Sequence, residues 1–292
     1  MNKILTEVYR PKSLDDIVGN EEIIKCLKSF ENLDATTSNM LFYGPPGVGK
    51  TTAIKCLLKR NYLELNASDD RGIQIVRENI KEYASINSFN FIILDEVDSM
   101  SRDAQGALRR IMEDFSDRAR FILICNYLNK IIDPIKSRCT KFRFKKVSDT
   151  SYLKKICEKE NIEYEELALK IISESSNGDM RRAINTLSGV SSSYKVINEV
   201  NTCKFLNILN SNQIDLIYNK LTNEDVKYNE VLNYFIENEI ELSNVINQLA
   251  EKIVKSDSIN PSKVIKIAQI EERLLVNCNN SLQLKAFIKL FK

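Results

Sequence analysis

The chain has 292 residues, of which 43% are hydrophobic and 28% charged, a composition typical of a globular protein with two or three domains. It contains no histidine, which excludes histidine triads and histidine metal sites and leaves Asp, Glu, Lys or a thiolate as the general base. The formal net charge is only +2, so nucleic-acid binding would need basic residues gathered on one face.

Five short apolar runs in the first half of the chain predict β-strands. They are rich in Ile, Phe and Leu, and they lie at residues 40–43, 62–65, 89–94, 120–125 and 141–144. Segments with helical spacing lie between or beside them, at residues 51–60, 71–81, 102–113 and 130–137. Alternation of strands and helices predicts a parallel five-stranded sheet with helices on both faces.

The rest of the chain is predicted to be helical. All eight glycines fall between Gly19 and Gly189, and the stretch that follows has long runs with helical spacing of Leu, Ile and Val. We therefore expect an α/β domain over residues 1–146, a small helical unit over 147–190, and an all-helical domain of about five helices over 191–292.

A phosphate-binding loop is the strongest motif in the sequence. It fits the pattern GxxxxGK[ST], and it stands between a predicted strand and a predicted helix, as that motif requires. Its lysine is expected to reach the β- and γ-phosphates of a nucleotide, and its threonine to bind Mg²⁺. An ordinary Gly-Pro turn is the alternative. The predicted contact residues are Gly44, Pro45, Pro46, Gly47, Val48, Gly49, Lys50, Thr51 and Thr52.

Polar residues end two of the predicted strands. Asp95 is expected to hold Mg²⁺, and Glu96 to orient the attacking water and take its proton, since the chain has no histidine for that role. Asn126 is placed to touch the γ-phosphate between the two central strands. The alternatives are two solvated acids at a strand end and an asparagine that starts a turn.

The run GDMRRAI at residues 178–184 opens a further helix. Asp179 is the expected N-cap, which puts Arg181 and Arg182 in the first helical turn. Cations oppose the helix dipole there, so a phosphate ligand would explain the placement. A solvated basic turn is the alternative.

Two amphipathic helices present polar faces. In the segment 71–81 that face carries Gln74, Arg77 and Lys81. In the segment 102–113 we expect Gln105, Arg109 and Met112 to point outward, while the inward set is Ala104, Ala107, Leu108, Ile111 and Phe115. These faces are either simply solvated or bind DNA by adding phosphate contacts from several copies.

Eight motifs occur in an order typical of one family. On these motifs the sequence resembles the small subunits of replication factor C, the AAA+ clamp loader of eukaryotes and archaea. The motifs are YRP (9–11), DIVG (16–19), GPPGVGKT (44–51), ELNASDDRGI (64–73), ILDEVDSM (93–100), AQGALRRIME (104–113), IIDPIKSRC (131–139) and GDMRRAI (178–184). The resemblance implies an AAA+ α/β nucleotide-binding domain, a helical lid and an all-α collar for oligomerisation. DEVD stands where the family usually has DEAD, a change that leaves the catalytic glutamate in place.

The resemblance also implies site residues. Lys50, Thr51, Asp95 and Glu96 keep the roles given above, and Asn126 and Arg181 become the first and second sensors of the nucleotide. Arg138 becomes the arginine finger that reaches the γ-phosphate held by the adjacent subunit; the alternative is that it caps its helix while Cys139 fills the core. Gln105 and Arg110 are implied to couple neighbouring subunits. The implied adenine contacts are Tyr9, Arg10, Pro11 and Val18, and the implied DNA contacts are Arg77, Lys81 and Arg102.

The implied activity is ATP hydrolysis with Mg²⁺, active within a heteropentamer of replication factor C subunits. That complex loads the ring-shaped sliding clamp (PCNA) onto primer–template DNA. Another AAA+ DNA machine and a mainly structural collar subunit are the alternatives, and the intact Lys50 and Glu96 oppose the second. Seven scattered cysteines without a CxxC pair, and the lack of an apolar signal core or membrane-length run, predict a cytosolic or nuclear protein. The resemblance implies the nucleus, or the cytoplasm if the protein is archaeal.

Overall fold

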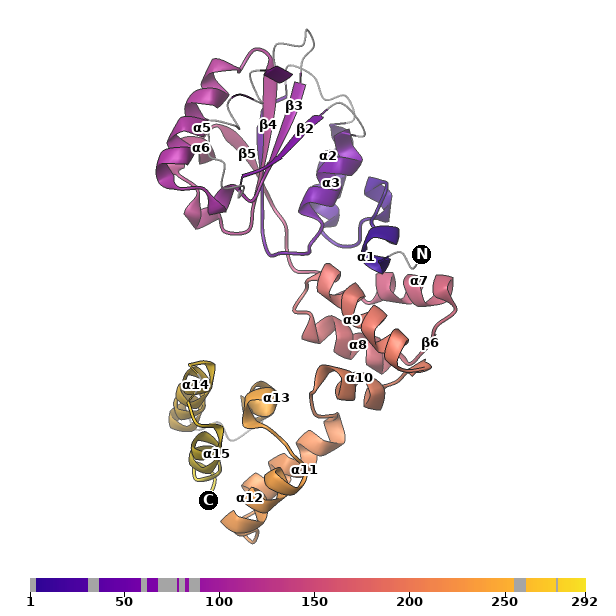
Figure 1. The fold of residues 1–292 in the computed structure, drawn as a ribbon, viewed down its shortest axis with the longest axis vertical. Helices are drawn as coiled ribbons and strands as arrows, with labels where there is room; N and C mark the ends of the chain where they lie inside the picture. The colour runs from indigo at the N-terminus through magenta and orange to yellow at the C-terminus, as the bar shows by residue number, and fades with distance from the viewer. Residues whose placement is uncertain are drawn as a thin grey trace. The chain divides into compact units, whose positions relative to one another are not determined.

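The structure of the chain is a computed structural model that describes residues 4–30, 37–58, 62–67, 78, 82–83, 90–254, 261–276 and 278–292. It contains two compact units, Met1–Lys195 and Val196–Lys292, whose elements are labelled in Figure 1. The units are described one at a time. The predicted domain limits after residues 146 and 190 stay predictions.

A five-stranded parallel sheet forms the centre of the first unit, as predicted. The strands run in the order β2-β3-β4-β1-β5. Each central strand pairs in parallel with its neighbours, for example Leu41 with Leu123 and Leu94 with Leu123. The carboxyl ends of the strands therefore meet at one edge of the sheet, where ligands of such folds bind. The strands are β1 (Asn39–Tyr43), β2 (Tyr62–Asn66), β3 (Asn90–Asp95), β4 (Ala119–Cys125) and β5 (Cys139–Arg143).

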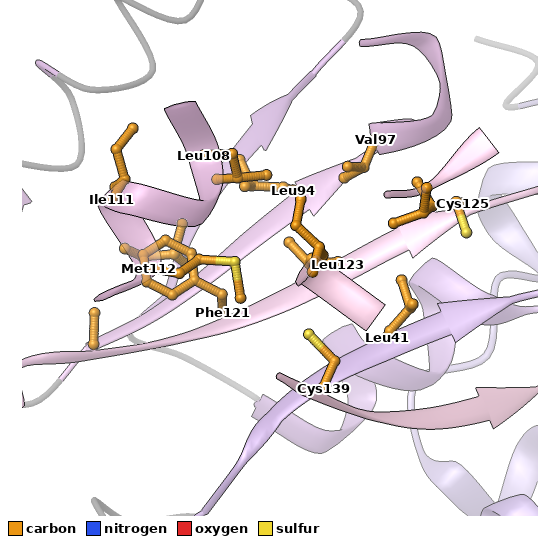
Figure 2. Packing of buried hydrophobic residues seen from close by; sticks show 14 residues of the cluster. Leu41, Leu94, Val97, Leu108, Ile111, Met112, Phe121, Leu123, Cys125 and Cys139 are labelled. Carbon is orange, nitrogen blue, oxygen red and sulfur yellow. The ribbon is translucent and has the colours of Figure 1, made fainter. Parts of the chain in front are cut away.

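Helices cover both faces of this sheet. Helices α2 (Glu21–Ser29) and α3 (Lys50–Leu58) lie on one face, and α5 (Arg102–Asp114) and α6 (Asp133–Lys136) on the other (Figure 1). Successive strand residues point to opposite faces, so Leu41 belongs to the cluster under α5 and Phe42 to the cluster under α3. Figure 2 shows the first cluster, in which residues of α5 stand over Leu94, Phe121 and Leu123. Burial on both faces explains the continuous apolar strands of the sequence.

The orientation predicted for α5 was wrong in part. Gln105 and Met112 were expected on the outer face, but their side chains are only 1% and 2% exposed. The buried stripe runs through Gln105, Leu108, Ile111 and Met112, with spacings of three and four residues that place them on one side of a helix. Because Gln105 is polar, the sequence pattern misplaced part of the buried side of the helix. Its polar side chain can be buried since it has hydrogen-bond partners there.

One predicted helix is replaced by two short elements. Residues 130–137 were expected to be a single helix, but the chain forms the 3₁₀ turn η3 (Leu128–Lys130) and then α6. Pro134 lies in the first turn of α6, and Ile132 before it is extended with ψ of 146°. A proline fits the first turn of a helix but does not let a helix continue through it from upstream.

A small helical bundle completes the first unit. It contains α7 (Ser151–Glu160), β6 (Glu163–Tyr164), α8 (Glu166–Ser175) and α9 (Met180–Ser193), with fully buried Leu153, Ile156, Leu169 and Leu187 between the helices. The N-terminal segment carries α1 (Leu5–Val8) and the 3₁₀ turn η1 (Leu14–Asp16), and α1 packs against α9.

The second unit is helical, with six helices among its described residues where about five were predicted. The last five of them share one core that contains Phe235, Leu249 and Phe287. No helix in the described part of either unit combines the length and apolarity that crossing a bilayer requires. Its elements are β7 (Val196–Ile197), α10 (Glu199–Leu206), α11 (Ser211–Thr222), α12 (Tyr228–Glu237), α13 (Leu242–Val254), α14 (Pro261–Leu275) and α15 (Asn280–Ile288).

Truncating a buried side chain of the central strand β4 should leave a cavity and destabilise the first unit. Leu123 in β4 is completely buried between α5 and the neighbouring strands, so Leu123→Ala should lower the free energy of unfolding of the first unit by about 2–5 kcal/mol. Urea unfolding followed by circular dichroism measures this, and the transition of the first unit is the one that ATP shifts. The matched control is Leu167→Ala in α8, where the leucine is 47% exposed; an equal loss in both variants would contradict the prediction.

Candidate nucleotide-binding site

The loop between β1 and α3 depends on glycine at two positions. Gly44 has φ of +144°, and a Cβ there would collide with the backbone carbonyl of Phe144. Gly47 has φ of +67°, and a Cβ there would collide with the carboxylate of Asp179. Glycine is needed at both for conformation and for space, so the loop can pack closely on the segment directly after β5 and on the start of α9.

Lys50 lies at the centre of the site. Its side chain is 7% exposed, and its Nζ donates to Gly44 O at 2.7 Å, Pro45 O at 2.7 Å and Asn126 Oδ1 at 2.9 Å. Burial lowers the pKa of Lys50, and the negative charge of Asp95 opposes that shift. The structure thus brings the loop lysine and the residue after β4 into direct contact.

The hydroxyl and carboxylate predicted to bind Mg²⁺ also meet. Thr51 Oγ1 donates to Asp95 Oδ2 at 2.8 Å, while Asp95 Oδ1 accepts from the backbone N–H of Glu96 at 2.8 Å. Glu96 adopts the left-handed backbone conformation with φ of +57°, which is uncommon for a residue with a side chain. Its exposed carboxylate lines the same pocket as Lys50 and Thr51.

One pocket contains most of the predicted nucleotide contacts. Tyr152 and Met180, which sequence analysis did not select, complete it from α7 and α9. Met180 stands within the GDMRRAI run but was not selected itself, and no local motif marks Tyr152, because it approaches the loop only through tertiary packing. The predicted residues that line the pocket are Tyr9, Arg10, Pro11, Val18, Pro46, Gly47, Val48, Gly49, Lys50, Thr51, Thr52, Asp95, Glu96, Asn126 and Arg181.

The N-terminal segment is fastened to α7 beside this pocket. Tyr9 OH donates to Glu160 Oε1 at 2.6 Å, and this hydrogen bond, with desolvation, raises the pKa of Tyr9 to about 12. Tyr152 OH donates to the carbonyl of Tyr9. Cys56 on α3 donates to Pro11 O at 3.4 Å. The segment implied to contact adenine is therefore held from two sides.

The start of α9 rests on the phosphate-binding loop. The backbone N–H of Met180 donates to Gly47 O at 3.1 Å, so the loop satisfies one of the free donors of the helix. Asp179 is the N-cap, as predicted, and accepts from the N–H of Arg182 at 3.0 Å. Arg181 lines the pocket and Arg182 is not among its lining residues.

Arg138 lies elsewhere in the first unit. Its Nη2 pairs with Glu113 Oε1 at 2.5 Å and its Nη1 donates to Pro134 O at 2.8 Å. Glu113 also accepts from Arg109 Nε at 3.1 Å. The Arg138 side chain is 39% exposed and does not line the pocket of its own chain. The neighbouring Cys139 is buried, with a pKa raised by desolvation to about 12, so its thiol stays protonated.

Gln105 has a different place from the one expected. Instead of pointing toward a neighbouring subunit, it is buried and donates from Nε2 to Met100 O at 3.2 Å and Lys130 O at 3.0 Å. Its Oε1 accepts from the N–H of Ile132 at 2.9 Å. The side chain therefore joins the segment after β3 to the segment after β4.

The predicted DNA contacts are only partly described. Arg77 and Lys81 lie outside the described residues, whereas Arg102 is exposed in the first turn of α5. Among the residues that the structure describes, no group of three or more Cys, Asp or Glu side chains forms a metal cluster.

Three family models match the chain, and together they span most of it. The first is the ATPase family associated with various cellular activities (AAA), over residues 40–147. The second is an RCF1/5-like AAA+ ATPase lid domain, over residues 151–189. The third is the replication factor C C-terminal domain, over residues 209–289.

Individual relatives agree with these matches. A replication factor C small subunit of Staphylothermus marinus is 40% identical over 311 residues, covering 97% of this chain and 92% of that protein. Replication factor C subunit 5 of Homo sapiens is 36% identical over 310 residues, covering 98% and 90%. Among solved structures, the RuvB Holliday junction branch migration motor of Thermotoga maritima has a TM-score of 0.56 at 20% identity, covering 92% and 91%, which shows a shared fold alone.

The parallel sheet, its phosphate-binding loop and the helical unit beside it define an AAA+ ATPase. The sequence identity of 36% and 40% to two relatives, over nearly their whole length, defines the family more narrowly. The chain belongs to the replication factor C small-subunit family, and it is an ATP-hydrolysing subunit of a clamp loader. The replication factor C C-terminal domain disfavours the alternative of another AAA+ DNA machine.

The buried hydrogen bonds of Gln105 should contribute to the stability of the first unit. Gln105→Leu fills a similar volume but leaves two carbonyls and one N–H without their partner, which should lower the free energy of unfolding of the first unit by about 2–4 kcal/mol. Urea unfolding measures the loss. Arg110→Leu, at an exposed position of the same helix, is the control and should change stability little; similar losses in the two variants would refute the assigned role.

Proposed function

We propose that this subunit binds ATP with Mg²⁺ in the pocket described above and uses hydrolysis to help load a ring-shaped sliding clamp onto primer–template DNA. The observation that carries the proposal is the contact of Lys50 Nζ with Asn126 Oδ1 beside the Thr51–Asp95 pair. That arrangement supports the proposal, because a cation, two hard oxygen ligands and an amide at one edge of the sheet would suit the phosphates and Mg²⁺ of ATP.

Thr51 and Asp95 would hold the Mg²⁺ ion. A hydroxyl and a carboxylate are hard oxygen ligands, the type that Mg²⁺ prefers, and their oxygens already lie 2.8 Å apart. When bound, the ion would neutralise charge on the phosphates. The two residues would then exchange their mutual hydrogen bond for contacts to the ion and its water shell.

The other pocket residues divide the work of hydrolysis. Lys50 would exchange its hydrogen bonds to the carbonyls of Gly44 and Pro45 for contacts with phosphate oxygens. Asn126 and Arg181 would contact the γ-phosphate. Glu96, whose carboxylate is exposed in the pocket, would orient the attacking water and accept its proton. At the other end of the pocket the adenine would lie against Tyr9, Arg10, Pro11 and Val18.

Arg138 would act on the nucleotide of the adjacent subunit. Its guanidinium is partly exposed and does not line its own pocket, and a second arginine held near the γ-phosphate stabilises charge that develops in the transition state. The alternative role has observations in its favour, because Arg138 does bond a carbonyl of α6 and Cys139 is buried. Assembly-dependent hydrolysis distinguishes the two.

The partners follow from the family. Multi-subunit assembly is a property of this clamp loader, and we propose the heteropentamer, the sliding clamp (PCNA) and primer–template DNA as the full set. Arg77, Lys81 and Arg102 would contact the DNA backbone. The relatives are archaeal and eukaryotic, so the compartment would be the nucleus or, in an archaeon, the cytoplasm.

The first test separates binding from chemistry. Glu96→Gln keeps the shape of the side chain and removes the base, so the assembled complex should bind ATP at this site with unchanged affinity and hydrolyse it at least about 100-fold more slowly. Labelled-ATP binding and single-turnover hydrolysis are the measurements. Hydrolysis at the wild-type rate in this subunit's site would mean that Glu96 is not the base.

The second test concerns Arg138 and uses the complete complex with its cellular partners. Arg138→Ala should leave ATP binding by its own chain intact and reduce hydrolysis in the adjacent site by about 10³-fold or more. Removing the loop lysine of that adjacent subunit should abolish the same activity, so the double variant should lose no more than the lysine variant alone. Arg118→Ala, an exposed arginine in the turn after α5, is the control. Losses that add would refute action in trans.

A further inference from the structure

Asp98 is a carboxylate near the site that has no part in the proposed catalysis. It lies in the 3₁₀ turn η2 (Val97–Ser99), directly after Asp95 and Glu96. Its Oδ2 accepts two backbone hydrogen bonds, from the N–H of Asn126 at 3.2 Å and from the N–H of Tyr127 at 3.1 Å. A residue of the segment after β3 therefore holds the first two residues after β4.

These two hydrogen bonds begin where the sheet stops. The paired register of β3 and β4 runs to Leu94 and Leu123, and β4 ends at Cys125. Beyond that point Asn126 and Tyr127 leave the sheet, and their N–H groups need acceptors from elsewhere. Hydrogen bonds to an ionised acceptor are stronger than those between neutral groups, and one carboxylate oxygen fixes both donors.

The position of Asn126 matters for the nucleotide. Its Oδ1 accepts from Lys50 Nζ at 2.9 Å, so the asparagine side chain lies beside the cation expected to hold the phosphates. Asp98 fixes the backbone that carries this side chain, and η2 fixes Asp98: the N–H and Oγ of Ser99 donate to Glu96 O at 2.9 and 2.7 Å. A short run of hydrogen bonds thus links Glu96 to Asn126 and then to Lys50.

We propose that Asp98 is a positioning residue that holds Asn126 against the γ-phosphate and thereby supplies part of the preference for ATP over ADP. The proposal rests on the contact proposed above between Asn126 and the γ-phosphate. ADP lacks that phosphate, so displacement of Asn126 weakens ATP binding selectively. A role in folding alone would leave the ratio of the two affinities unchanged.

The experiment measures dissociation constants of the full chain for ADP and for a non-hydrolysable ATP analogue, by competition with a fluorescent nucleotide. Asp98→Ala should raise the dissociation constant of the analogue by about tenfold and that of ADP by less than about twofold, because about tenfold corresponds to one charge-assisted hydrogen bond. Asp98→Asn keeps an acceptor oxygen at the same place, and its affinity ratio should stay within about threefold of the wild-type value. Asp103→Ala, an exposed carboxylate in the first turn of α5, should change neither constant.

Asn126→Ala supplies the comparison that separates the two proposals. Asn126→Ala should directly lower the ratio of the affinity for the ATP analogue to the affinity for ADP. Asp98→Ala combined with Asn126→Ala should lower this ratio no further than Asn126→Ala alone. An unchanged ratio in Asn126→Ala would overturn the γ-phosphate contact and the Asp98 role together. A lowered ratio in Asn126→Ala with an unchanged ratio in Asp98→Ala, or effects that multiply in the double variant, would overturn the Asp98 role alone. Where Asp98→Ala does not fold, Asp98→Ser, whose shorter side chain does not reach both donors, takes its place with the same expected loss.

Discussion

The buried ammonium of Lys50 is the constraint around which the first unit is arranged. A cation with 7% exposure is costly unless polar partners surround it, and here three oxygens do so. Two come from the loop, in which Gly44 lets the backbone pass close to the carbonyl of Phe144, and the third comes from Asn126, directly after the strand next to β1. Only a parallel sheet with β4 beside β1 brings Asn126 to this point.

From that contact the sheet edge continues as a connected set of hydrogen bonds. Asp98 links the segments after β3 and β4 near the pocket, and Gln105 links them again further out through Met100, Lys130 and Ile132. The second segment leads into α6, and α6 ends two residues before Arg138. Residues proposed to sense one nucleotide and a residue proposed to act on another therefore share one rigid support.

The sequence predicted those features that local patterns encode. The strands follow from short apolar runs, the loop from its glycines and lysine, and the N-cap of α9 from Asp179, because each signal lies within a few residues. Gln105 was misplaced because its polar character outweighed its position in the buried stripe of α5. Asp98 and Tyr152 escaped notice since their partners come from other elements, and no spacing in the chain reports such contacts.

The ion pair of Arg138 with Glu113 does not conflict with a role for the arginine in trans. Side chains that are 39% and 37% exposed form a pair screened by water, and such pairs contribute about 0–1 kcal/mol. An arginine finger contributes about 10³ to 10⁵ in rate, equivalent to about 4–7 kcal/mol in the transition state. Breaking the exposed pair would therefore cost little compared with the transition-state stabilisation that the proposed role would supply, so the pair does not oppose that role. Glu113 pairs with both Arg138 and Arg109, and in the proposed assembly this contact would limit the rotamer entropy that Arg138 loses when a subunit docks.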